Sequence, residues 1–149
     1  MMKRFLYTVL ALMLVLPVAA EDVEIAFDRL PEKAQKIVGK AYPDTRIKKV
    51  EMERRASLLQ YEVKLAGGVK LQFSKDGSLT ECECNNSAVP DVLIPSRIKN
   101  FMADEFPDRE IRRFEHDGKL YELLLDNGDE LSFNSSYRLI DIDRTPEQK

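Results

Sequence analysis

The sequence predicts an α+β protein built as a tandem repeat of one helix plus four antiparallel strands. Together, the two repeats should form an eight-stranded antiparallel sheet with two helices packed on one face. Three observations predict this fold. The segment AYPDTRIKKVE at 41–51 is echoed by EFPDREIRRFE at 105–115. Each copy begins with apolar residues at helical spacing, and each continues with apolar and polar residues in alternation.

The first twenty residues have the composition of a secretory signal peptide. Lys3 and Arg4 precede an apolar run over 5–15, and small residues end at Ala20 before the acidic Glu21. This pattern predicts cleavage near Ala20 and a periplasmic or secreted mature chain. The apolar run is shorter than the ~20 residues that span a bilayer, so we expect no membrane anchor in the mature chain.

The mature chain is acidic. Removing residues 1–20 leaves 21 basic against 26 acidic residues, a net charge of −5. Proteins that bind nucleic acid normally carry a basic balance or a basic stripe, so this composition argues against such a partner. The length of 21–149 suits a single domain.

The internal repeat covers most of the mature chain. We place the two copies at about 28–84 and 92–143, joined by a linker at 85–91. The residues that match at an offset of 64 include Pro31 and Pro95, Pro43 and Pro107, Ile47 and Ile111, and Glu51 and Glu115. The residues that match at an offset of 60 include Tyr61 and Tyr121, Gly68 and Gly128, Phe73 and Phe133, and Leu79 and Leu139. A unit of this size buries little by itself, so the two copies should share one sheet and one core.

Each copy should start with an amphipathic helix. Apolar residues recur at helical spacing over 30–42 and over 94–106. Pro31 and Pro95 suit the first helical position, where a missing N–H costs nothing. Pro43 and Pro107 should end the helices, because a residue that precedes proline is disfavoured in the α region.

The remainder of each copy should form half-buried antiparallel strands. Apolar and polar residues alternate over 61–65, 69–73 and 121–125. Pairs such as Gly67-Gly68 and Asn127-Gly128 separate the strands and suit tight hairpins. One face of the sheet should therefore pack on the helices, and the other should face water.

The two copies differ in length by four residues between 51 and 61. Because this number is even, it can lengthen both arms of the first hairpin without exchanging their faces. Two explanations of the four extra residues stay open. They are an insertion that a surface loop tolerates without a function, or a segment that contacts a partner. The candidate contact residues, on this hairpin and the adjoining sheet face, are Glu51, Glu53, Arg54, Arg55, Leu58, Glu62 and Lys64.

Several segments resemble a known family. They are DGSLTEC at 76–82, the linker NNSAVP at 85–90, IPSRIKNFMADEFPD at 94–108 and the closing LIDID at 139–143. The chain resembles the PepSY-like, beta-lactamase-inhibitor-like family of secreted Bacteroidetes proteins over essentially all of its mature length. The resemblance implies a beta-lactamase-inhibitor-like fold, a periplasmic or outer-surface location, and inhibition or regulation of a hydrolase without a shared catalytic apparatus.

One feature departs from inhibitors of that fold, which engage an enzyme through an aromatic sheet face. Here the residues opposite the helices are mostly charged, and the chain contains no Trp. Binding hot spots are enriched in Trp, Tyr and Arg. We therefore do not predict inhibition of a beta-lactamase.

No catalytic site and no cofactor are predicted. The single His116 falls beside the turn Asp117-Gly118, where a solvated histidine is expected and no acid–base partner is apparent. The chain has no Gly-rich phosphate loop, nucleophile elbow or paired metal-binding histidine motif.

Cys82 and Cys84 form a Cys-x-Cys motif at the end of a predicted strand. Cys82 aligns with Ile142 in the second copy, which predicts a small buried apolar residue. Cys84 enters the linker and is expected to be more accessible. Residues two apart on a strand pair only with distortion, so a strained local disulfide, an intermolecular one and two free thiols all stay open.

We expect a non-enzymatic extracytoplasmic binding or regulatory module that presents its sheet face and first hairpin to a protein partner, an envelope hydrolase being one candidate. The alternative is a carrier of a small ligand or a cation on the same face. Its carboxylates could bind calcium through oxygen ligands, although no ligand loop is recognisable and we predict no metal site. The carboxylates considered for calcium are Glu81, Glu83, Asp141 and Asp143.

Overall fold

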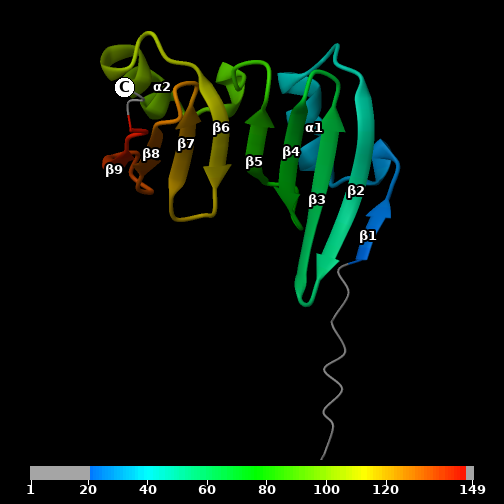
Figure 1. Ribbon diagram of the computed structural model, residues 1–149. Helices are drawn as coiled ribbons and strands as arrows, with labels where there is room; N and C mark the ends of the chain where they lie inside the picture. The colour runs from blue at the N-terminus through cyan, green and yellow to red at the C-terminus, as the bar shows by residue number, and fades with distance from the viewer. Residues whose placement is uncertain (1–20, 147–149) are drawn as a thin grey trace, which may run out of the picture.

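The chain forms one antiparallel sheet in which nine strands lie side by side in chain order (Figure 1). The computed structural model describes residues 21–146, so the predicted signal peptide lies outside the described residues. The strands are β1 Glu21–Glu24, β2 Ile47–Arg55, β3 Leu58–Leu65, β4 Val69–Ser74, β5 Leu79–Cys84, β6 Ile111–His116, β7 Tyr121–Leu125, β8 Glu130–Phe133 and β9 Leu139–Asp143.

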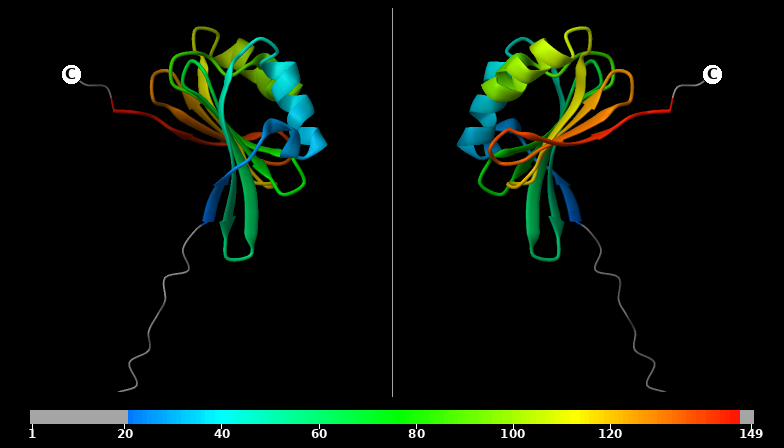
Figure 2. Two further views of the ribbon diagram at one scale, coloured as in Figure 1. Left: turned by 90° about the vertical axis from the view of Figure 1, so that its right-hand side faces the viewer. Right: turned by 90° about the vertical axis from the view of Figure 1, so that its left-hand side faces the viewer.

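Two helices, α1 Glu32–Ala41 and α2 Ser96–Glu105, lie on the same side of this sheet (Figure 2). A short 3-10 turn precedes each helix, η1 at Phe27–Arg29 and η2 at Asp91–Leu93. Pro31 and Pro95 occupy the N-cap positions, one residue before the position that the sequence predicted. Both helices end just before the second proline of each copy, as predicted.

The predicted fold class is confirmed, because α1 is followed by β2–β5 and α2 by β6–β9. The sheet has one strand more than predicted. The additional β1 pairs with β2, so that Glu24 lies opposite Glu51. β1 covers the edge of β2, just as β5 of the first copy covers the edge of β6 in the second. Its sequence EDVE is exposed throughout, so it carries no alternating pattern that would predict a strand.

The core lies between the helices and the apolar face of the sheet. Ala34 on α1 and Ile98 on α2 are completely buried, and so are Phe73 and Phe133 at equivalent positions of the two copies. The Phe101 ring on α2 meets the Phe133 ring edge-on, with centroids 5.2 Å apart. Each buried Ile or Phe side chain contributes ~1.5–3 kcal/mol to the hydrophobic stabilisation of the fold.

The β4–β5 turn packs tightly against the start of α1. Gly77 has a φ of +86°, and a Cβ atom there would lie 2.8 Å from Pro31 Cβ and 3.1 Å from the Ala34 nitrogen. The corresponding turn of the second copy carries Tyr137 with a φ of +63°. The Tyr137 ring packs on Tyr121 with centroids 5.2 Å apart. The first copy therefore needs glycine here, whereas the second accommodates a side chain.

The hairpin of β2 and β3 projects beyond its neighbours, as the even length difference predicted (Figure 1). Arg55 lies opposite Leu58, so Ala56 and Ser57 alone form the turn. Ala56 adopts a φ of +52°, a conformation that costs more for Ala than for Gly.

Two predictions about single residues are wrong. Cys84 is only 1% exposed, because the core continues beneath the end of β5. His116 is the last residue of β6, and its ring stacks on Tyr121 with centroids 3.9 Å apart. It is therefore half-buried rather than solvated. The predicted burial of Cys82 is confirmed at 0% exposed.

Candidate functional site

The face of the sheet opposite the helices is the candidate site. No described element covers it (Figure 2). Side chains alternate between the two faces of a strand, so the buried Val63 and Leu71 point to the helices while their neighbours Glu62 and Gln72 point away. This polar face is therefore the surface of the sheet that is open to a partner or ligand.

A single row of acidic residues crosses this face at right angles to the strands. The register places one residue of each strand directly opposite the next, and every position except Gln72 and Ser132 is a carboxylate. From β1 to β9 this acidic row contains Glu24, Glu51, Glu62, Gln72, Glu81, Glu115, Glu122, Ser132 and Asp141. Neighbouring strands lie ~4.8 Å apart, so the row is a closely spaced line of negative charge.

A neighbouring row supplies the counter-charges. It contains Lys49, Lys64, Lys70, Glu83, Arg113, Leu124, Glu130 and Asp143. Ion pairs join the two rows: Lys64 Nζ lies 3.2 Å from Glu62 Oε1, and Arg113 Nε lies 3.2 Å from Glu115 Oε1. Lys49 pairs with Glu51 and lowers the pKa of that carboxyl through a hydrogen bond.

The compensation is incomplete where the two copies meet. Glu81 lies opposite Glu115, and Glu115 lies opposite Glu122. Burial and then the Glu115 carboxylate raise the pKa of Glu122, which makes no ion pair within residues 21–146. Burial also raises the pKa of Glu81, although Lys70 at 3.8 Å opposes the effect. Like charges that face each other across strands destabilise a sheet.

A hollow of about 320 Å³ lies over this junction. Strands of both copies line it: Gln60 and Gln72 come from the first copy, and Glu115 and Glu122 come from the second. His116 forms part of its wall. The hollow therefore combines amide donors with the three facing carboxylates Glu81, Glu115 and Glu122 of the row.

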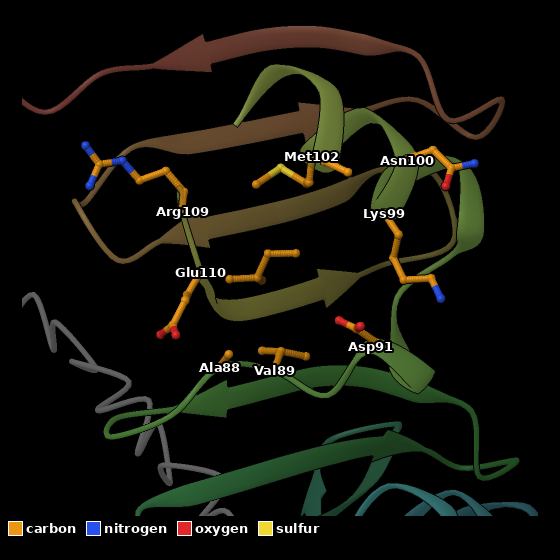
Figure 3. Close-up of a pocket in the computed structure, with 10 residues that line it drawn as sticks. Ala88, Val89, Asp91, Lys99, Asn100, Met102, Arg109 and Glu110 are labelled. Atoms are coloured by element: carbon orange, nitrogen blue, oxygen red, sulfur yellow. The ribbon is translucent and has the colours of Figure 1, made fainter. Parts of the chain in front are cut away.

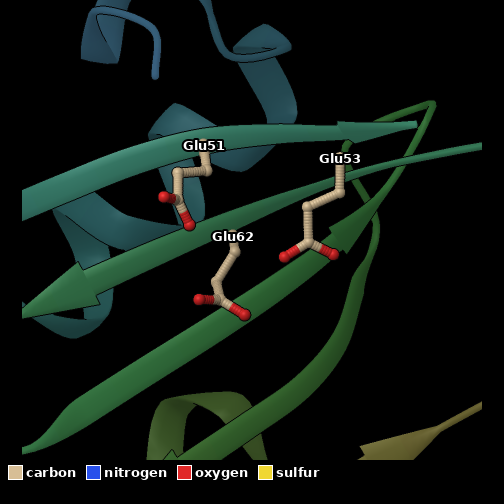
Figure 4. Close-up of side chains that lie close together, drawn as sticks. All are labelled: Glu51, Glu53 and Glu62. Atoms are coloured by element: carbon tan, nitrogen blue, oxygen red, sulfur yellow. The ribbon is translucent and has the colours of Figure 1, made fainter. Parts of the chain in front are cut away.

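Three carboxylates converge on the same face where β2 and β3 meet. Oxygen atoms of Glu51, Glu53 and Glu62 all lie within 4.8 Å of one another, and their side chains point to one side (Figure 4). Glu53 and Glu62 are 7% and 8% exposed. Gln60 donates a hydrogen bond of 2.6 Å to Glu53, and Gln72 donates one of 3.3 Å to Glu62.

The structure brings some of the predicted contact residues together and separates others. Glu51, Glu53, Glu62 and Lys64 are neighbours on the polar face. Arg54 faces the opposite side of β2, because it lies between Glu53 and Arg55 on an alternating strand.

At the end of the hairpin, Leu58 is 58% exposed. Arg55 lies directly opposite it. These two residues therefore extend the polar face toward the hairpin tip and stand apart from the carboxylate cluster.

The prediction of contact residues missed the junction carboxylates Glu81, Glu115 and Glu122. Their alternation placed them on the polar face. Their alignment with one another depends on the pairing of β5 with β6, which joins segments on either side of the linker and α2. No local pattern reports that pairing.

Another cavity lies away from the polar face and is larger than the junction hollow. It measures about 430 Å³ and is bounded by the linker, α2 and the start of β6 (Figure 3). Val89 and Met102 contribute apolar surface, whereas Lys99 and Arg109 lie on opposite sides of it (Figure 3). Its charged groups do not converge on one point, and none of the predicted contact residues lines it.

Comparisons with known proteins agree with this architecture. A family model described as "putative beta-lactamase-inhibitor-like, PepSY-like" matches residues 18–81 and again 59–141. No curated protein matches the chain. No helix within 21–146 has the length and apolar character needed to cross a membrane.

Three solved structures share the fold. A "putative periplasmic protein" of the DUF2874 family from Bacteroides vulgatus is 35% identical, with a TM-score of 0.80, over 83% of this chain and 98% of its own. A "putative calcium-regulated periplasmic protein" from Bacteroides thetaiotaomicron is 32% identical, with a TM-score of 0.80, over 83% and 97%. A second Bacteroides vulgatus periplasmic protein, of unknown function, is 29% identical, with a TM-score of 0.77, over 83% and 100%.

The family model matches twice, which agrees with the tandem repeat, and the two overlapping matches together span well over half of the chain. The chain belongs to the PepSY-like, beta-lactamase-inhibitor-like family.

Proposed function

We propose that the protein is a non-enzymatic extracytoplasmic binding module that uses the polar face of its sheet to bind a basic surface of another protein. The acidic row is the observation that carries this proposal. Facing carboxylates at Glu81, Glu115 and Glu122 repel one another in the free protein. A bound Lys or Arg side chain would relieve that repulsion.

The ion pairs already present on the face favour a partner that lies along the acidic row. The lysines of the neighbouring row occupy the side of Glu51, Glu62 and Glu81 nearest to them. At the junction hollow, Glu122 makes no ion pair within residues 21–146 and faces the Glu115 carboxylate. Electrostatic complementarity of this kind sets specificity and association rate more than affinity.

The projecting hairpin supplies a second contact in the proposal. Leu58 is an exposed apolar side chain beside Arg55 at its end. An apolar anchor next to a charged face is a common arrangement at protein interfaces. We assign Arg55 and Leu58 to the edge of the binding surface and Arg54 to its far side.

The location in the proposal follows from the predicted signal peptide and from the periplasmic proteins that share the fold. The name of the family suggests a hydrolase of the cell envelope as the partner. The activity of such a partner would then be regulated by occlusion rather than by any chemistry of this chain.

The test is capture from a native envelope fraction with matched variants of the mature protein. The face variant carries Glu81→Gln, Glu115→Gln and Glu122→Gln. The control variant carries Asp104→Asn, Glu105→Gln and Asp108→Asn, which remove the same charge from exposed positions at the end of α2 and just after it. We expect wild type and control to capture the same partner and the face variant to lose it. Equal capture by all three would contradict the proposal.

A second candidate function is a binding site for calcium on the same face. The convergence of Glu51, Glu53 and Glu62 favours it, since calcium prefers carboxylate oxygens. A structure with 32% identity is described as calcium-regulated, which supports the same ion. In this alternative the cation would replace the lysines that now neutralise the cluster.

Calcium titration monitored by thermal unfolding separates the two candidates. Millimolar calcium should raise the Tm of wild type more than magnesium does. Glu53→Gln with Glu62→Gln should abolish that increase, while Glu81→Gln with Glu115→Gln should retain it. A calcium-induced shift that is the same in both double variants, or no shift in wild type, would rule out the cluster as a calcium site.

A further inference from the structure

Cys82, Cys84 and Tyr42 form a compact group on the opposite side of the sheet from the polar face. The two Sγ atoms are 3.8 Å apart. The Tyr42 hydroxyl lies 3.3 Å from Cys84 Sγ and 3.8 Å from Cys82 Sγ. Both cysteines are free thiols and almost fully buried.

The elements hold these three side chains in place from two directions. Cys82 and Cys84 are two residues apart on β5 and so point to the same side, where they pair with Leu71 and Val69 of β4. Tyr42 is the C-cap of α1, and its N–H donates to the Val38 carbonyl at 2.8 Å. The end of α1 therefore places the phenol oxygen directly over the two sulfur atoms.

The second copy shows that packing does not require this group. The C-cap of α2 is Phe106, which has the backbone conformation of Tyr42. Ile142 lies opposite Leu131 as Cys82 lies opposite Leu71. The same fold position is therefore filled by a phenyl ring and an aliphatic side chain. The hydroxyl and the thiols are additions that belong to the first copy alone.

The separations are those expected of ligands on one tetrahedral metal ion. With Zn–S bonds of about 2.3 Å, two thiolates at the tetrahedral angle lie about 3.8 Å apart. An oxygen ligand bound at about 2.0–2.2 Å lies about 3.5–3.7 Å from each sulfur. The observed distances of 3.8 Å between the sulfurs and of 3.3 and 3.8 Å to the oxygen agree with three corners of that tetrahedron.

We propose that Cys82, Cys84 and Tyr42 bind one zinc(II) ion, with water in the fourth position. Thiolate ligands select thiophilic metals, and tetrahedral geometry selects zinc among them. The two thiol protons and the Tyr42 phenol proton leave for solvent when the ion binds. The bound ion would link the end of α1 to the end of β5 and would keep both cysteines reduced in an oxidising compartment. This site is independent of the acidic row, because it lies on the helix side of the sheet.

The experiment is titration of the reduced mature protein with cobalt(II), followed by zinc(II). We expect one cobalt ion per chain, a thiolate-to-cobalt charge-transfer band, and loss of that band when zinc displaces cobalt. Cys82→Ile should abolish the band, and Tyr42→Phe should weaken cobalt binding by about tenfold or more. Both substitutions copy residues that the second copy already uses at these positions, so both variants should fold, which circular dichroism would verify.

Two results would overturn the proposal. The first is a charge-transfer band that persists in Cys82→Ile, or the absence of that band from wild type. In the latter case, reaction of two thiols after denaturation would verify that both cysteines were reduced. The second is protein isolated from the envelope with Cys82 and Cys84 joined in a disulfide and with no bound metal. Slower alkylation of both thiols with zinc than without it in wild type, and a smaller difference in Tyr42→Phe at limiting zinc, would support the proposal independently of the optical spectra.

Discussion

Glu122 is a carboxylate of the polar face that has no ion-pair partner within residues 21–146. It lies opposite Glu115, and its pKa is raised by burial and by that neighbour. Glu122→Gln should therefore raise the free energy of unfolding at pH 7 by about 0.5 kcal/mol, the size of one unfavourable cross-strand pair. Urea denaturation would measure the change.

Glu130→Gln is the matched control on the same face. Glu130 faces Arg113 at 3.5 Å, so its removal should leave stability unchanged or slightly lower. An equal gain in both variants would show that overall net charge, and not the local row, is responsible.

The carboxyl groups also predict how stability depends on pH. Glu81 and Glu122 have raised pKa values, so the native state binds protons more readily than the unfolded chain, and their contribution rises as pH falls from 7 toward the ordinary Glu value of 4.5. Asp76 and Asp129 behave in the opposite way. Hydrogen bonds from Ser74 and from the Thr145 backbone, respectively, lower their pKa values, to about 2 for Asp76.

We therefore expect the unfolding free energy to hold or rise between pH 7 and about 5, and to fall below the ordinary Asp value of 3.8. Urea denaturation at a series of pH values would test this. A steady decrease from pH 7 downward would contradict the assignment of Glu81 and Glu122. The difference between wild type and Glu122→Gln should shrink as Glu122 becomes protonated.

Gly77 should be the glycine of the repeat turns least tolerant of substitution. Gly77→Ala forces a side chain into the left-handed region and places its Cβ 2.8 Å from Pro31. Gly118 has a similar φ of +95° with nothing within 4 Å, so Gly118→Ala isolates the cost of conformation alone. We expect a loss of about 1 kcal/mol for Gly118→Ala and a clearly larger loss for Gly77→Ala. Equal losses of stability in the two variants, measured by thermal unfolding, would show that α1 moves to make room for the new Cβ at little cost.

Single residues were the hardest part of the fold to predict. Burial of Cys84 depends on Tyr42 of α1, which lies forty-two positions earlier in the chain. The stacking of His116 depends on Tyr121 across the hairpin. Local patterns show the spacing of apolar residues along a helix or strand. They do not show which side chain of another element packs against its end.

At the scale of elements, the long hairpin shows what the sequence does predict. A four-residue excess in one copy indicated longer arms with unchanged faces, and β2 and β3 have nine and eight residues against six and five in β6 and β7. β1 was missed because its four exposed residues have no pattern. That the edge of β2 pairs with another strand becomes clear only in the structure, where β5 pairs with β6 in the same way.

Removing Arg54, Arg55, Leu58 and Leu59 while keeping the Ala56-Ser57 turn should shorten the hairpin without unfolding the protein. Glu53 would then remain opposite Gln60 as it does now. We expect a change in unfolding free energy of less than about 1 kcal/mol, since surface loops tolerate changes of length. We also expect weaker capture of the envelope partner, because the shortened hairpin lacks Leu58. Full capture by a folded trimmed variant would remove the hairpin from the proposed surface.

At the scale of the whole molecule, the acidic row exists only because the two copies form one sheet. Repetition supplied the two helices and the strands β2 to β9, with their order and their faces, and these were predicted, whereas β1 lies outside the repeat. The junction between β5 and β6 brings Glu81 and Glu115 together, and this pairing spans the linker and α2. The candidate site was therefore predictable as a face, whereas the run of facing carboxylates at the junction was not.

The most direct measurement is the affinity of the captured partner for the mature protein, determined by calorimetry at low and at high salt. The account predicts that Glu81→Gln, Glu115→Gln and Glu122→Gln together raise Kd by about tenfold or more, that the Asp104, Glu105 and Asp108 control variant leaves it unchanged, and that salt weakens wild-type binding most. The account would be contradicted if neither the three substitutions in the acidic row nor salt changed the affinity, or if the affinity fell equally in the face variant and the control variant.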